Sequence, residues 1–252
     1  MKELQKENTA DATSIFWQMI LNLTGRSAHT SVLRGDVLVD SQKIQGVDAH
    51  GPVLLAFYKA LQSRLYVIFG EHEKGASLAL GVPRNTHFSP IIMGDTFTRG
   101  VCLFAMARKT KRRKFARRAK EIRSLIKSWV KQGNPNVQHY LALLDAEMAA
   151  LKGKIQSAER HFQDAVITAA RGGFVHDAAL ASERYGEFLL NDKPQPCELD
   201  KQEALYRFSE AIKYYSDWGA VSKVASLQKS MQTLNLWKPP GEVSTFIQSG
   251  EQ

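Results

Sequence analysis

The sequence contains only two cysteines and no apolar stretch long enough to cross a bilayer. Cys102 lies inside an apolar run and Cys197 in a proline-rich linker, so neither a disulfide framework nor a cysteine-based metal site is expected. The longest uncharged stretch near the N-terminus, residues 12–25, falls short of the ~18 apolar residues that a membrane span requires. The first residues mix charges and do not form a signal peptide. We therefore expect a cytoplasmic protein without a membrane span.

Motifs that carry catalysis or cofactor binding are also missing. Gly153-Lys154 does not complete a P-loop, because Met148 stands where the upstream glycine is required. Gly-x-Ser-x-Gly, His-Glu-x-x-His and Cys-x-x-Cys do not occur, and the histidines are not spaced to chelate a metal from one helix face. These absences favour a binding module over an enzyme, with no cofactor and no metal.

One segment carries the whole excess of positive charge. The formal net charge is +9, and residues 108–123 hold ten Lys/Arg against one acid, Glu121. Phe115, Ala119 and Ile122 keep the spacing of a buried helix face through this segment, so we expect its charges on the outer face of a helix. The candidate interaction patch comprises Arg108, Lys111, Arg112, Arg113, Lys114, Arg117, Arg118, Lys120 and Arg123.

The patch is open to several interpretations. The first is a solvated helix face without function, and the second is a docking face for an acidic protein segment. The third is a nuclear localisation signal at residues 111–114, and the fourth is a site for nucleic acid or acidic lipid. Docking of an acidic partner is the favoured functional interpretation. Local polyanion binding through residues 108–123 is the alternative.

The second half of the chain is predicted to consist of helices separated by short turns of Gly, Pro and Asn. It also contains an internal sequence repeat. Residues 158–166 match residues 204–212 at an offset of 204 − 158 = 46, which also takes Gly173 to Gly219. Small alanines at fixed helix positions let a neighbouring helix approach, and a large phenylalanine fills the space beside them. The residues expected to pack the repeat are Ala158, Phe162, Ala165, Ala204, Phe208, Ala211, Trp218 and Gly219.

Two acids recur among apolar residues. Glu147 and Glu183 occupy equivalent helix positions, at an offset of 183 − 147 = 36. One interpretation makes them functional acids whose pKa is raised by burial. The favoured one is structural, with each carboxylate accepting hydrogen bonds from an Arg or Tyr of a neighbouring helix.

The first half shows weaker patterns. Helices are expected over residues 9–23, from Gly51-Pro52 to about Ile68, and over residues 91–109, with a long surface loop at residues 25–50. We expect an N-terminal helical segment at residues 1–96, helical repeats at residues 97–237 and a flexible tail at residues 238–252.

The repeat region resembles a known family. Residues 139–147, 158–165, 178–183 and 211–223 are similar to the tetratricopeptide-like helical region of STAND-type signalling ATPases and hybrid kinases. In those proteins this region follows kinase-like and ATPase modules, and nothing in the present chain resembles such modules. The resemblance implies a scaffold, either as a separate adaptor or as the regulatory part of a larger signalling protein.

The expected fold is all-α, with about ten helices stacked as antiparallel hairpins into a tetratricopeptide-like α-solenoid that forms a right-handed superhelix. The expected function is non-catalytic protein–protein interaction, on the concave surface or on the basic patch. Protein partners with acidic segments are favoured over nucleic acid.

Overall fold

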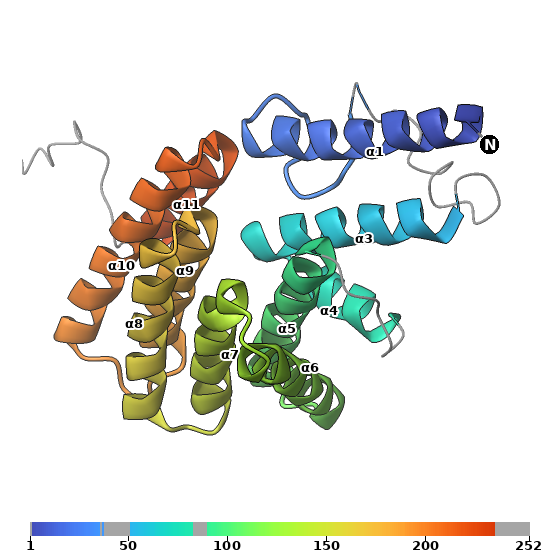
Figure 1. Ribbon diagram of the computed structural model, residues 1–252. Coiled ribbons are helices and arrows are strands. Elements are labelled where there is room, and N and C mark those ends of the chain that lie inside the picture. Colours follow the sequence, from blue (N-terminus) through green and yellow to red (C-terminus); the bar gives the residue numbers. More distant parts are fainter. Residues whose placement is uncertain (1, 36, 38–50, 83–89, 235–252) are drawn as a thin grey trace, which may run out of the picture.

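Helices account for all of the regular structure in the described part of the chain. The computed structural model describes residues 2–35, 37, 51–82 and 90–234 (Figure 1). Its ten α-helices and one 3-10 turn are α1 (Lys2–Leu23), α3 (Gly51–Ile68), α4 (His72–Leu80), α5 (Pro90–Thr110), α6 (Arg113–Lys131), η1 (Pro135–Val137), α7 (Gln138–Leu151), α8 (Ile155–Arg171), α9 (Val175–Asn191), α10 (Glu198–Asp217) and α11 (Val221–Thr233). No strand occurs in these ranges, which confirms the all-α prediction.

From α5 onward, each helix packs against the next one in the chain (Figure 1). In addition, α5 contacts α7, and α7 contacts α9. Gly173 and Gly219 end α8 and α10 with φ of 76° and 81°, a left-handed conformation that glycine adopts without strain. After each glycine the next backbone N–H, of Phe174 or Ala220, donates to a carbonyl five residues back at 2.9 Å. Both turns thereby reverse the chain in the same way.

The six alanines and phenylalanines of the internal repeat are all buried, as expected. Phe162 of α8 stacks on Tyr185 of α9, with ring centroids 5.5 Å apart. Phe208 of α10 lies over Gly186 of α9, where an added Cβ would approach its ring to 3.0 Å. The two phenylalanines of the repeat thus pack against consecutive residues of one helix, α9.

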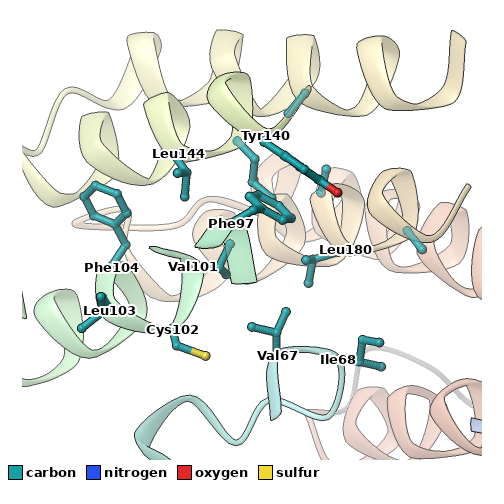
Figure 2. Packing of buried hydrophobic residues seen from close by; sticks show 14 of the residues in the cluster. Val67, Ile68, Phe97, Val101, Cys102, Leu103, Phe104, Tyr140, Leu144 and Leu180 are labelled. Atoms are coloured by element: carbon teal, nitrogen blue, oxygen red, sulfur yellow. The ribbon is translucent and has the colours of Figure 1, made fainter. Parts of the chain in front are cut away.

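The N-terminal helices share one core with the helices from α5 onward. One hydrophobic cluster includes residues from α1 through α11. Figure 2 shows Val67 and Ile68 of α3, Cys102 of α5 and Leu180 of α9 as members of this cluster. The boundary expected after residue 96 lies within α5.

Part of the expected surface loop is anchored in the structure. Leu33 is buried, and its backbone N–H donates to Oε1 of Gln62 at 2.9 Å. The amide nitrogen of Gln62 in turn donates to the carbonyl of Ser31 at 2.6 Å. Residues 38–50 of this loop and the tail at residues 238–252 lie outside the described residues.

Helix α4 was not predicted from the sequence. It is short, and Gly75 interrupts its pattern of apolar residues. In the structure, Gly75 lets α4 approach α5 closely, because a Cβ at this position would lie 2.3 Å from Sγ of Cys102. The glycine that obscures the helix in the sequence is therefore a packing residue.

In the part of the chain that the structure describes, no helix has both the length and the apolar character of a membrane span.

Candidate functional site

Most of the predicted basic patch lies on the outer face of α6 and on the turn before it. Its six solvent-exposed members are Lys111, Arg112, Arg113, Lys114, Arg117 and Lys120. The buried face of α6 comprises Phe115, Ala119, Ile122, Ile126 and Trp129, as the spacing predicted. None of the six exposed cations forms an ion pair with a residue that the structure describes. We refer to these six residues as the α6 basic face.

Arg108 does not belong to this surface, and its assignment to the patch was wrong. It lies in the last turn of α5, which faces α7 and α9, and it is only 8% exposed. Its Nη2 lies 3.1 Å from Oε2 of Glu147, and its Nη1 lies 3.3 Å from Oδ2 of Asp192. Arg108 therefore pairs with the buried Glu147 and the half-buried Asp192, and it is not available to a partner.

Arg118 and Arg123 are half-buried and also contact the protein itself. Arg118 pairs with Glu121 at 3.0 Å and donates to the backbone carbonyl of Val82 at 3.3 Å. Arg123 forms an ion pair with Asp145 of α7. These two arginines fix α6 to its neighbours, so they contribute less to the outer surface than the six exposed cations.

A hollow of about 1050 Å³ lies along the α6 basic face. The described residues that line it are Arg113, Lys114, Ala116, Arg117, Lys120, Glu121 and Ser124. All of these described lining residues belong to α6.

Glu147 of α7 lies at the centre of a buried ion-pair network that joins α5, α7 and α9. It is fully buried and accepts hydrogen bonds from Nε and Nη2 of Arg184, at 2.8 and 3.3 Å. Burial alone would raise the pKa of this carboxyl, but the guanidinium groups of Arg108 and Arg184 lower it below its ordinary value. Glu147 therefore remains charged, in the structural role expected for it.

His72 of α4 covers one side of this network. Nη1 of Arg184 lies 3.2 Å from Nε2 of His72, so the arginine donates to an unprotonated ring nitrogen. The other ring nitrogen, Nδ1, lies 3.9 Å from Sγ of Cys102. Burial and the charge of Arg184 lower the pKa of His72 to about 3. The histidine is therefore neutral, and it links α4 to α9 and α5.

Glu183 of α9 has a different set of partners. Tyr215 of α10 donates to its Oε2 at 2.9 Å, and Nζ of the buried Lys223 of α11 lies 2.5 Å from its Oε1. Burial raises the pKa of the Glu183 carboxyl, and burial with the nearby carboxylate also raises the pKa of the Tyr215 hydroxyl. Glu183 therefore joins α9, α10 and α11, in the same way as Glu147 joins α5, α7 and α9.

A third polar cluster joins α7 to α9. Asp177 accepts from Nε2 of His139 at 3.0 Å, and Nε2 of His176 lies 3.3 Å from the same oxygen. His139 stacks on Phe174, and His176 stacks on Trp218 with ring centroids 5.1 Å apart. Trp218 thus fills space between helices, as expected, whereas Trp17 of α1 is 50% exposed.

These three polar clusters hold neighbouring helices together. Within residues 2–35, 51–82 and 90–234, no group of three His, Cys, Asp or Glu side chains is arranged to hold a metal ion. Burial raises the pKa of the Cys102 thiol to about 12, which keeps it protonated and weakly nucleophilic at neutral pH. Sequence reasoning missed Arg184, His72 and Asp177. The available signal for Arg184 was the charged pair Glu183-Arg184, which closely follows the apolar residues 178–181 of α9.

Comparisons with protein-family models, with curated proteins and with solved structures find no match to this chain.

Proposed function

We propose that this chain is a non-catalytic scaffold that binds an acidic segment of a protein partner through the α6 basic face. Its helices would form a tetratricopeptide-like solenoid with the right-handed superhelical path typical of such repeats. The sequence resemblance favours a role as the regulatory part of a signalling ATPase or kinase system, or as a separate adaptor in one.

The proposal rests on the density of exposed cations on the α6 basic face. Some exposed cations on other helices have acidic partners one turn away, as Lys74 pairs with Glu71 and Lys201 with Glu198. Others, such as Lys152, Lys154 and Arg160, form no ion pair with a described residue. The α6 basic face differs in density, because six exposed cations lie within residues 111–120 and none pairs with a described acid. Like charges at this spacing destabilise a helix slightly, and an acidic partner would remove that repulsion.

The alternative surface, on the inner helices, is covered by the chain itself. In a solenoid of these hairpins, α5, α7 and α9 would form the inner layer. His72 of α4 lies on Arg184 of α9, and Arg64 of α3 forms a hydrogen bond with Tyr140 of α7. A partner would have to displace α3 and α4 to reach this layer, whereas the α6 basic face is already accessible.

Affinity capture with matched charge variants tests the proposal. One variant carries Arg113→Gln, Lys114→Gln, Arg117→Gln and Lys120→Gln, and leaves the buried face of α6 unchanged. The control variant carries Lys152→Gln, Lys154→Gln, Arg160→Gln and Arg171→Gln at exposed positions of the α7–α8 hairpin and loses the same charge. Partners are captured from native cells with each protein and quantified by mass spectrometry.

The α6 variant should lose partners that the control variant retains, and wild-type capture should weaken steeply with added salt. Both variants should unfold within about 0.5 kcal/mol of the wild type, because exposed charges contribute little to stability. Equal capture by all three proteins would overturn the proposal. Capture that disappears after nuclease treatment would favour the alternative, local binding of nucleic acid.

A further inference from the structure

The exposed cations of α6 form a straight row along the helix. An α-helix turns by about 100° per residue, so Arg113, Arg117, Lys120, Lys127 and Lys131 lie within about 40° of one line. All five are exposed, and they lie opposite the buried residues Phe115 to Trp129 of the same helix. We refer to these five residues as the α6 cation row, which extends the α6 basic face to the end of the helix.

No acid interrupts the α6 cation row. Glu121, the one acid of α6, lies to the side of the line and pairs with Arg118. Arg113 with Arg117, and Lys127 with Lys131, are like charges four residues apart, an arrangement that destabilises a helix. The row therefore presents one sign of charge over about 27 Å, since 18 residues rise by 1.5 Å each.

Ser124 occupies the middle of the row. It is exposed, and it fills the seven-residue interval between Lys120 and Lys127. A small neutral side chain at this point allows a neighbouring backbone to approach more closely than it could over Lys or Arg.

We infer that the partner segment is an acidic α-helix that lies along α6, with carboxylates spaced like the cations at intervals of four, three, seven and four residues. This inference rests on the proposed function and specifies the structure of the bound segment. Two helices have the same rise per residue, so equal residue spacings bring each acid opposite a cation along the whole row.

An extended segment matches the row at fewer positions. The five cations lie at about 0, 6, 10.5, 21 and 27 Å along the helix axis. An extended chain presents side chains on one face at intervals of about 6.7 Å, so its acids would lie near 0, 7, 13, 20 and 27 Å and would miss only Lys120, by about 3 Å. A helical partner therefore places an acid opposite all five cations, and an extended partner opposite four.

Two synthetic peptides of identical composition test the inference. Both are helix-forming alanine- and glutamine-based peptides with five glutamates. In the first, the glutamates follow the four, three, seven and four spacing; in the second, they are distributed around all faces of the helix. Affinity for the full chain is measured by fluorescence anisotropy at low salt, and circular dichroism verifies that both peptides are equally helical.

The peptide with matched spacing should bind at least tenfold more tightly than the second peptide. Ser124→Glu should weaken its binding about tenfold, and Ser124→Lys should strengthen it severalfold. Lys152→Glu, which makes the same or a larger change in charge at an exposed site away from α6, should leave the affinity unchanged.

Equal affinity for the two peptides, or no binding of either, would overturn the inference. Insensitivity to Ser124→Glu would overturn it as well. The proposed function would still stand in those cases if affinity capture depended on Arg113, Lys114, Arg117 and Lys120. It fails only if capture is independent of these residues, so the two failures are distinguishable.

Discussion

Arg184 and Glu147 meet through two hydrogen bonds, with Nε to Oε1 at 2.8 Å and Nη2 to Oε2 at 3.3 Å, although they are 37 residues apart in sequence. Arg108 approaches the same carboxylate from a third helix at 3.1 Å. A single buried acid therefore holds two buried guanidinium groups, and the stacking of α5, α7 and α9 depends on its charge.

Replacing this acid by its amide should destabilise the protein strongly. Glu147→Gln leaves Arg108 and Arg184 buried without their shared counter-charge, which we expect to lower the free energy of unfolding by about 3–5 kcal/mol. Urea denaturation measures the change. Glu203→Gln, at an ion pair whose acid is 41% exposed, serves as the control and should change stability by less than about 1 kcal/mol. A decrease in the free energy of unfolding of less than about 1 kcal/mol for Glu147→Gln would contradict the prediction.

The stability of the protein should fall as the pH is lowered from 7 to 5. The pKa of His72 is about 3 in the folded protein against 6.5 for an ordinary histidine, so the unfolded chain takes up a proton that the folded chain does not. This difference lowers the free energy of unfolding by about 2 kcal/mol over that interval.

The variant His72→Gln separates the contribution of this histidine from that of the other titrating groups. Its side-chain carbonyl can still accept from Arg184 but cannot be protonated in this range. The pKa of His176 is also lowered by burial, so part of the pH dependence should remain in the variant. Denaturation at pH 7, 6 and 5 should show a smaller fall for His72→Gln, and identical falls for both proteins would contradict the assignment.

The close approach of α4 to α5 is testable by a double-mutant cycle. Gly75→Ala places a methyl group against Sγ of Cys102 and should destabilise the protein by about 1–3 kcal/mol. In a Cys102→Ala background the clash is removed, and the higher helix propensity of alanine should make the same substitution neutral or stabilising by up to ~1 kcal/mol. Equal effects in both backgrounds would show that the two residues do not constrain each other.

The alanines of the repeat should not accept larger side chains. Ala165→Leu and Ala211→Leu each overfill a contact that is 1% or 0% exposed, and each should destabilise the protein by about 1–3 kcal/mol. Ala225→Leu on the exposed face of α11 is the control and should change little. Unchanged thermal midpoints for the two buried positions would remove the support for the repeat.

The sequence predicted those parts of the fold that depend on local spacing. The stripe from Phe115 to Trp129 indicated the buried face of α6, and the pattern around Phe162 and Phe208 indicated that both phenylalanines are buried. Gly173 and Gly219 marked the turns because a left-handed backbone favours glycine. In each case a few neighbouring residues contain the physical cause.

Contacts between residues far apart in the sequence could not be predicted from local spacing. Arg108 was grouped with the exposed cations because its neighbours in sequence are cations, whereas its burial depends on Glu147 and Asp192 in other helices. His72 meets Arg184 across 112 residues, and no local pattern indicates that pairing. Helix α4 was missed because Gly75 is unfavourable in a helix until Cys102 is placed beside it.

The contact between α1 and α11 joins the first and last described helices (Figure 1). In a linear repeat array the terminal helices touch only one neighbour and fray independently of the middle. Here α11 is supported by α10 on one side and by α1 on the other. Slow hydrogen exchange should therefore extend into α11, and truncation at the N-terminus should loosen a helix at the opposite end of the chain, as in a closed ring.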